Sequence, residues 1–227
     1  MSEWWTYTLS DIQSFSLQTW YRLFERYNTA IWPVQIAALA LGLAILALLR
    51  RPDVRLGRII AAILGVCWLW IAIAFFAMRY AKLAWVAVYF AWGFGLEAAL
   101  LLWTGIVRGG LAFERRPAGL GVFLLALVVA PLIGPLLGRE WRQVEVFGAA
   151  PDPTAVGTLG ILLLATGRPR WELIALPAVW CAISGASLAA MNAPAAWIMP
   201  AAAVLIVILA AWRPFARRRK NLRKDAR

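Results

Sequence analysis

An acidic side chain, Glu97, lies in the middle of a long apolar segment of the sequence. An ionised carboxylate at the centre of a membrane costs on the order of 2.5–3.5 kcal/mol on insertion scales, so it is expected to face other helices or a cavity. The functional interpretation is a proton or cation site. The structural interpretation is a protonated acid that hydrogen-bonds a neighbouring helix, with Gly93 and Gly95 allowing close helix approach.

A second group of polar residues lies in two short motifs, Pro-Asp-Pro-Thr at residues 151–154 and Gly-Thr-Leu-Gly at residues 157–160. Asp152 or Thr154 is expected to cap a helix, since proline is tolerated in a first turn. The predicted helix has about 15 residues and a length of about 22 Å, which is shorter than the ~30 Å thickness of the hydrocarbon core of a membrane. The helix start is therefore expected below the membrane surface, in a locally thinned bilayer, or after a re-entrant segment. Buried helix N-termini bind anionic substrates in transporters; a capped helix without a ligand is the alternative.

We include Thr158 and Asn192 with these residues as candidate binding groups. Thr158 follows the Asp-Pro-Thr sequence by one turn, and Asn192 is a polar residue in a forty-residue stretch, 173–212, that contains no charge. The predicted binding set is therefore Glu97, Asp152, Thr154, Thr158 and Asn192.

Several chemistries are excluded by residue type. Histidine is absent, which removes the commonest metal ligand and general base. The apolar segments contain no lysine, and nucleophile-elbow, HExxH and P-loop motifs do not occur. Cys67 and Cys181 each lie in the middle of an apolar segment without metal-ligand spacing, so we interpret them as buried thiols. We expect no cofactor, no metal site and no catalytic residue, and an enzyme acting on lipid is the least favoured class.

The elements that must position these residues are membrane helices. Of the 227 residues, 63% are hydrophobic, and the mean hydropathy is +0.73. The net charge of +12 does not indicate nucleic-acid binding, because the basic residues are concentrated in short loops and the C-terminal tail. The sequence predicts an all-α, polytopic transmembrane bundle of seven spans, at about residues 31–49, 59–76, 83–107, 118–137, 153–167, 172–190 and 195–212.

The basic residues also predict the orientation. With the N-terminus outside, the inner loops and tail hold 17 lysines and arginines and the outer segments hold 6. Because positive residues are retained in the cytoplasm, this bias predicts an N-out, C-in protein.

Three regions are predicted: an interfacial segment at 1–30, a transmembrane domain at 31–212 and a basic tail at 213–227. Trp20, Leu23, Phe24 and Tyr27 fall on one helical stripe, which is typical of a helix at the membrane surface; the alternative is a helix that extends the first span into water. The tail is an orientation signal that is also compatible with binding anionic lipid. Seven spans with the N-terminus outside are also the layout of transporters built from three plus one plus three helices, which allows spans 1–3 and 5–7 to form a repeat.

The sequence resembles a family of bacterial integral membrane proteins that is known as a domain of unknown function. The resemblance covers nearly the whole chain except the tail, and it rests on residues 2–7, 20–24, Trp32-Pro33, 151–154 and 157–160. It implies a compact protein of the bacterial inner membrane and brings no activity. Our first functional hypothesis is small-molecule or ion transport or binding near Glu97 and the start of the fifth span. The alternative is a non-catalytic membrane subunit that partners another protein.

Overall fold

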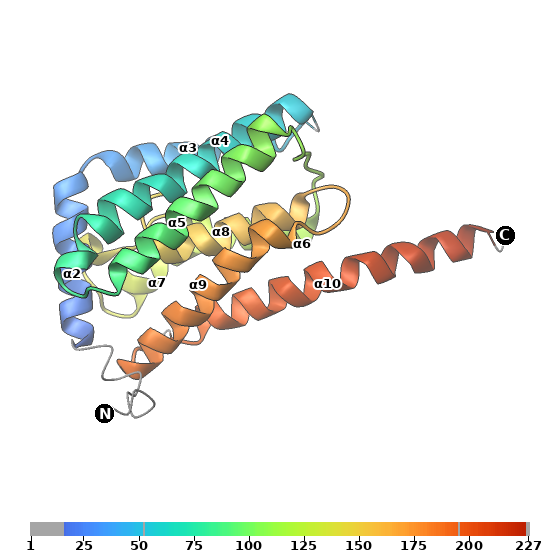
Figure 1. Cartoon of the computed structure of the whole chain (residues 1–227). Coiled ribbons are helices and arrows are strands. Elements are labelled where there is room, and N and C mark those ends of the chain that lie inside the picture. Colours follow the sequence, from blue (N-terminus) through green and yellow to red (C-terminus); the bar gives the residue numbers. More distant parts are fainter. Residues whose placement is uncertain (1–15, 52, 195, 226–227) are drawn as a thin grey trace, which may run out of the picture.

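The computed structural model describes residues 16–51, 53–194 and 196–225, with side chains described as far as residue 212 except at position 199. Within these ranges every extended regular element is a helix, and the only β-type pairing is an isolated bridge between Phe113 and Ala165. The predicted all-α class is confirmed. Most helices run along one direction, while α2 crosses one end of the bundle and α10 extends beyond the other (Figure 1).

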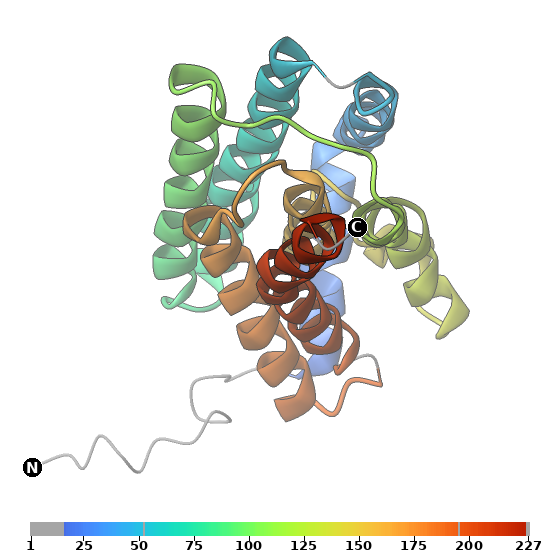
Figure 2. The ribbon, with the colours of Figure 1, turned by 90° about the vertical axis from the view of Figure 1, so that its right-hand side faces the viewer.

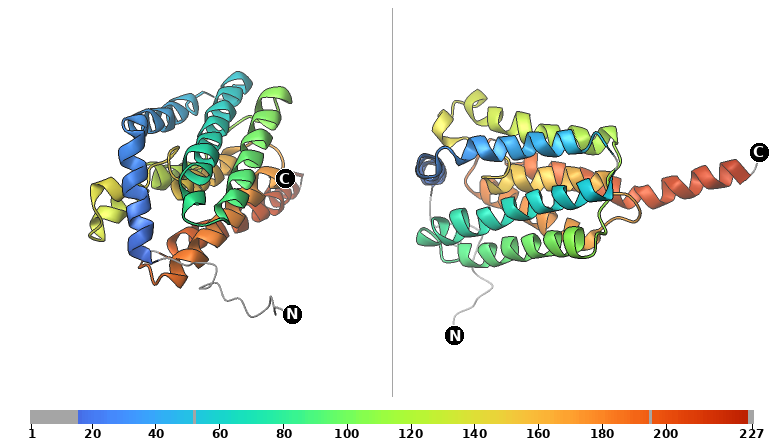
Figure 3. Two further views of the ribbon diagram at one scale, coloured as in Figure 1. Left: turned by 60° about the vertical axis from the view of Figure 1, so that its left-hand side comes forward. Right: turned by 90° about the horizontal axis from the view of Figure 1, so that it is seen from above.

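The first two helices meet at nearly a right angle. α2 (Leu17–Ile31) and α3 (Val34–Leu48) are bent by 88° relative to each other. Pro33 lies at the junction, and its missing N–H and fixed φ interrupt the helix there. As a result α3 runs along the bundle and α2 lies across its end (Figure 3).

The aromatic side of α2 faces the protein. Trp20, Phe24 and Tyr27 are buried, and their rings surround Phe75 at centroid distances of 6.2, 5.1 and 5.1 Å. The Tyr27 hydroxyl also donates to the carbonyl of Ala149 at 2.7 Å. The predicted helix and its aromatic stripe are present, and the stripe anchors α2 to the bundle. Its position at a membrane surface stays a prediction.

The next elements form a long hairpin in which both helices contain a π-helical turn. In chain order they are α4 (Val54–Trp70), η2 (Ile71–Ala77), η3 (Tyr80–Lys82), α5 (Ala87–Leu102) and η4 (Trp103–Val107). Gly105 packs directly on Ala61, where a Cβ would collide with the alanine side chain. The missing side chain lets the two helices pack closely along the hairpin.

The second half of the chain consists of a broken helix, a short helix and two longer helices. In chain order they are α6 (Pro117–Leu124), η5 (Leu125–Val129), α7 (Ala130–Leu136), η6 (Trp141–Gln143), α8 (Pro151–Leu164), α9 (Trp171–Ala190) and α10 (Ile198–Asp225). The short helix α8 lies in the middle, with α6, α9 and α10 around it (Figure 2). α10 continues without a break through residue 212, where the transmembrane domain was predicted to end.

Helix α8 is the core of the bundle. All fourteen of its residues are buried, and it packs against α4, α6, α9 and α10. A Cβ on Gly160 would lie 2.8 Å from the backbone nitrogen of Phe123 and 3.0 Å from the carbonyl oxygen of Gly119, so glycine permits direct backbone contact with α6. With fourteen residues α8 is about 21 Å long, shorter than the ~30 Å hydrocarbon core.

Four segments of the described chain are long and apolar enough to cross a membrane: Val54–Lys82, Ala87–Val107, Pro117–Leu136 and Trp171–Ala190. The bent pair of α2 and α3 would make a fifth, whereas α8 and the apolar part of α10, Pro200–Trp212, are shorter. Helices therefore occupy all seven predicted segments, but length and composition support four or five candidate spans. Seven crossings and the N-out, C-in orientation remain predictions.

Candidate binding site at the start of helix α8

The start of α8 is held by a threonine. The Thr154 hydroxyl donates to the carbonyl of Ala150 at 2.6 Å and accepts the backbone N–H of Gly148 at 2.8 Å. Gly148 has a φ of +81°, a conformation that favours glycine. The expected cap is corrected: Ala150 occupies the N-cap position, and neither Asp152 nor Thr154 caps the helix with its side chain. The Thr154 side chain instead hydrogen-bonds the backbone of the preceding loop and holds that loop against the first turn of α8.

Asp152 is satisfied by the neighbouring helix α9. The indole Nε1 of Trp180 donates to Oδ1 at 2.8 Å, and the Ser184 hydroxyl donates to Oδ2 at 2.7 Å. Trp180 and Ser184 are four residues apart, so one face of α9 presents both donors. All three side chains are buried. The carboxyl group is therefore a fixed hydrogen-bond acceptor that joins α8 to α9.

A second acid and an arginine lie close to Asp152, in the segment before α8. Arg139 pairs with Glu145 at 3.4 Å, donates to the carbonyl of Gln143 at 2.6 Å and stacks on Tyr21 at 4.2 Å from the ring centroid. Among the described residues its buried Nε has no partner. Burial, together with the nearby charge of Asp152, raises the pKa of Glu145 to about 7, although Arg139 opposes the rise.

These three charged residues line one small cavity. Arg139, Glu145 and Asp152 surround a volume of about 50 Å³, which exceeds the ~30 Å³ that a water molecule occupies in the liquid. An apolar groove of about 280 Å³ runs from it between the α6–α7 segment and α10. The cavity and the groove share four lining residues: Ala130, Ile133, Pro153 and Ile198. The polar cavity therefore borders an apolar groove on the side of the bundle.

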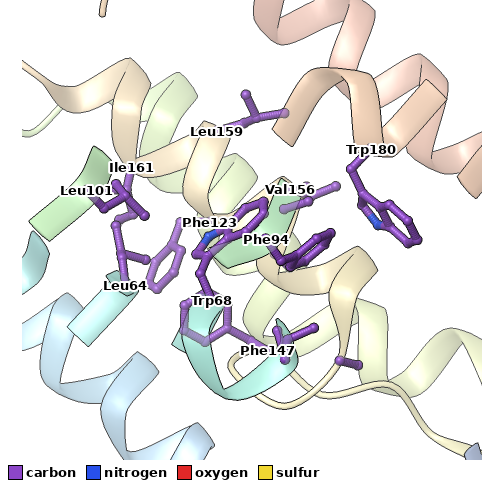
Figure 4. Packing of buried hydrophobic residues seen from close by; sticks show 14 of the residues in the cluster. Leu64, Trp68, Phe94, Leu101, Phe123, Phe147, Val156, Leu159, Ile161 and Trp180 are labelled. Atoms are coloured by element: carbon purple, nitrogen blue, oxygen red, sulfur yellow. The ribbon is translucent and has the colours of Figure 1, made fainter. Parts of the chain in front are cut away.

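Further along α8, Thr158 has a structural partner. The indole Nε1 of Trp68 donates to the Thr158 hydroxyl at 2.9 Å in the buried core. Phe94 lies between the two tryptophans, 4.3 Å from Trp68 and 5.1 Å from Trp180 by ring centroids (Figure 4). Both indole N–H groups thus donate to α8 from opposite sides of one aromatic cluster. The hydroxyl of Thr158 is engaged in this packing.

Glu97 lies one turn after Phe94 on α5, and it is fully buried. Neither carboxyl oxygen has a hydrogen-bond partner among the described residues, so the hydrogen bond of the structural interpretation is not formed there. The expected close approach at Gly93 and Gly95 is also wrong, because an added Cβ at either position meets nothing within 4 Å. Glu97 is absent from the lining of the cavity at Asp152.

The remaining predicted residues lie apart from the cavity. Asn192 follows α9 with a φ of 55°, and its backbone N–H bonds the carbonyl of Ala189 at 2.9 Å. Asparagine tolerates this left-handed conformation, which explains its presence at a helix end. Cys67 and Cys181 are buried free thiols. In the described ranges no cluster of three or more metal-ligating side chains occurs.

Sequence reasoning missed four residues of the site: Arg139, Glu145, Trp180 and Ser184. The first two lie in a loop of mixed charge that carries no local motif. The other two were visible as hydrogen-bonding side chains four residues apart in the apolar middle of a helix, which places them on one face. That spacing is the signal that could have linked α9 to Asp152.

These features define an all-helical protein with four to five candidate membrane spans and a buried polar site beside a short central helix. A family model matches residues 17–221, and the chain belongs to that family, the family of unknown function DUF6064. The resemblance to a family of unknown function is thereby confirmed. Neither a comparison with curated proteins nor one with solved structures finds a match.

Proposed function

We propose that this protein binds a small amphiphilic molecule at the start of α8 and carries it within the bacterial inner membrane, N-terminus outside. The observation that carries this proposal is that the polar cavity and the lateral apolar groove lie side by side and share four lining residues, Ala130, Ile133, Pro153 and Ile198. A polar head group fits the cavity, and an aliphatic chain fits the groove.

The charges of the cavity indicate the chemistry of the head group. Glu145 and Asp152 supply carboxyl acceptors, while the terminal nitrogens of Arg139 are engaged by Glu145 and Gln143 and only its Nε offers a free donor among the described residues. A group that donates hydrogen bonds is therefore favoured, such as an amine or a set of hydroxyls. Buried acceptors reject a ligand that lacks matching donors, because its binding would leave them without solvent or partner.

The test is mass spectrometry of molecules that co-purify with protein extracted directly into lipid particles. Glu145→Gln removes one of the two carboxyl groups in the cavity, and Ala202→Leu narrows the groove from α10. We expect both variants to lose the molecule that wild type retains. Glu140→Gln is the matched control, since Glu140 is an exposed acid of the same loop, and it should retain the molecule.

Glu97→Gln is the fourth arm of this experiment. Because Glu97 does not line the cavity, we expect the variant to keep the molecule at the wild-type amount. Loss in Glu97→Gln would extend the site to α5. The same profile of molecules in all variants, Glu145→Gln and Ala202→Leu included, would contradict the proposed site.

A non-catalytic subunit is the second candidate function. It is favoured by three large aromatic residues on the outward side of the α5 segment, Trp85, Tyr89 and Trp92, which are 73, 66 and 76% exposed. Such a stripe fits either lipid or the helix of a partner. If it contacts a partner, Trp92→Ala with Tyr89→Ala should reduce the mass of the complex extracted from native membranes without lowering the melting temperature of the purified protein.

A further inference from the structure

Four basic side chains from two separate elements surround one pocket at the end of the bundle that α2 crosses. Arg22 and Arg26 come from α2, and Arg79 and Lys82 come from the turn that follows η2. The pocket has a volume of about 400 Å³, within the range of small-molecule sites in proteins. Figure 1 shows α2 lying against this end of the α4–α5 hairpin.

The aromatic cluster beneath the pocket fixes the two elements. Trp20 and Phe75 both contact Tyr80 at centroid distances of 5.4 and 6.1 Å, which ties α2 to the turn. Arg79 lies 5.4 Å from the ring centroid of Tyr27 and donates to the carbonyl of Ala74 at 2.9 Å. This arginine is therefore oriented before any ligand binds, which reduces the entropy lost on binding.

Within the described ranges the four cations have no acidic partner. In the described part of the chain, the ion pairs involve Arg116, Arg139 and Arg170, and none involves a residue of this pocket. Arg22 and Arg26 are also four residues apart on one helix, a spacing at which like charges repel each other. An anion would offset this repulsion.

The distribution of charge strengthens this argument. In the predicted N-out orientation, the outer segments hold six basic residues, although such residues are disfavoured there. Four of the six line this pocket, and a fifth, Arg139, is paired with Glu145. The basic residues at this end of the bundle are therefore concentrated around one pocket.

We infer that this pocket binds a phosphate-bearing anion. Guanidinium groups bind phosphate oxygens in a bidentate manner, and the Thr19 hydroxyl, also in the lining, can add a neutral donor. Leu23 and Leu83 complete the wall and provide an apolar edge at the end of the spans. The phosphate can belong to the head group of an anionic phospholipid or to a soluble molecule. This site is separate from the one at α8 and does not depend on its function.

The experiment compares two double variants with the same change in charge. Arg22→Gln with Arg26→Gln alters the pocket, and Arg50→Gln with Arg51→Gln alters exposed arginines after α3, away from the pocket. Detergent-purified full-length proteins are mixed with phosphatidylglycerol or phosphatidylcholine and analysed by native mass spectrometry. In parallel, their melting temperatures are measured with and without inorganic phosphate.

Preferential retention of phosphatidylglycerol, weakened about tenfold only in the pocket variant, would assign the phosphate to a lipid. A rise in melting temperature with inorganic phosphate, absent only in the pocket variant, would assign it to a soluble molecule. The single change Lys82→Gln should weaken the same signal about threefold, which guards against misfolding of the double variant. Binding that is equal in wild type and in both double variants, or no binding in either assay, overturns the inference.

Discussion

Two buried carboxyl groups of this protein have opposite surroundings. Asp152 on α8 accepts hydrogen bonds from Trp180 and Ser184 at 2.8 and 2.7 Å, and it borders a cavity. Glu97 on α5 is fully buried and has no hydrogen-bond partner in the described part of the chain. The carboxyl group of Asp152 therefore joins two helices and borders a cavity, whereas the carboxyl group of Glu97 is an isolated polar group among the described residues.

This difference shows that depth in an apolar segment does not by itself identify a site. Glu97 is the more conspicuous residue of the sequence, because it interrupts a membrane-like segment. Asp152 lies beside two prolines, but the fold brings Arg139 and Glu145 to it from an earlier segment. Convergence of several polar groups on one cavity is the stronger argument for binding.

The largest effect is expected from Asp152→Leu. This change leaves the indole N–H of Trp180 and the hydroxyl of Ser184 buried without an acceptor. Each unsatisfied buried group costs about 1–3 kcal/mol, so we expect the free energy of unfolding to fall by about 3 kcal/mol. Denaturation of the detergent-solubilised protein, followed by circular dichroism, measures the loss.

Two control variants distinguish the loss of the carboxylate from a change in side-chain shape and from a general loss of packing around α8. Asp152→Asn keeps one carbonyl acceptor and should cost about 1 kcal/mol. Thr158→Val removes the neutral acceptor of Trp68 from the same helix and should cost about 1–2 kcal/mol. If Asp152→Leu is as stable as wild type, the carboxylate is not the acceptor of these two donors.

A smaller effect of opposite sign is expected from Glu97→Leu. Replacing a buried carboxyl that has no described partner by an apolar side chain removes the cost of burying it, so the free energy of unfolding should rise by about 1 kcal/mol. Glu97→Gln keeps the shape and a polar group and should change it by less than about 0.5 kcal/mol. The same denaturation assay applies to both variants.

The result for Glu97 would sharpen or remove the contrast with Asp152. A loss of more than about 1 kcal/mol in Glu97→Leu would show that the carboxyl has a favourable partner in the membrane-embedded protein. Glu97 would then join Asp152 as a residue whose acid group is required. A gain in stability in Glu97→Leu would mean that, of these two buried acids, only Asp152 at the start of α8 is required.

The helical class and the approximate positions of seven apolar helical segments were predictable from hydropathy, because apolar segments of this length have few other solutions. The right angle between α2 and α3 was not, although Trp32-Pro33 marked the place. The stripe of Trp20, Phe24 and Tyr27 was recognised, but a stripe on one helix does not reveal whether protein or lipid covers it.

The candidate site was predictable only in part. Asp152 and Thr154 were found from their position before a short apolar helix, while their partners depend on contacts between distant segments. Trp180 is 28 residues from Asp152 and Trp68 is 90 residues from Thr158. Local patterns specify such residues by type, and only the packing of α4 and α9 around α8 selects these pairs.

The last expected effect is a dependence of stability on pH, and it concerns the acid beside Asp152. Burial raises the folded-state pKa of Glu145 from about 4.5 to about 7, so the folded protein holds a proton that the unfolded chain releases in this window. The associated stability is complete below pH 4.5 and is lost as the pH rises through 7. We expect the wild-type melting temperature to fall by roughly 5–10 °C between pH 5 and pH 8.

Glu145→Gln should flatten this fall, since the variant has no carboxyl to ionise beside Asp152, whereas Glu140→Gln, which alters an exposed acid of the same loop, should leave it unchanged. Arg139, at 3.4 Å, stabilises the ionised form of Glu145, and this opposing effect is already included in the pKa of about 7. An identical slope in wild type and Glu145→Gln would mean that Glu145 ionises without penalty. The polar cavity at α8 would then be more open to water than its packing indicates, and the contrast with the sealed environment of Glu97 would become larger.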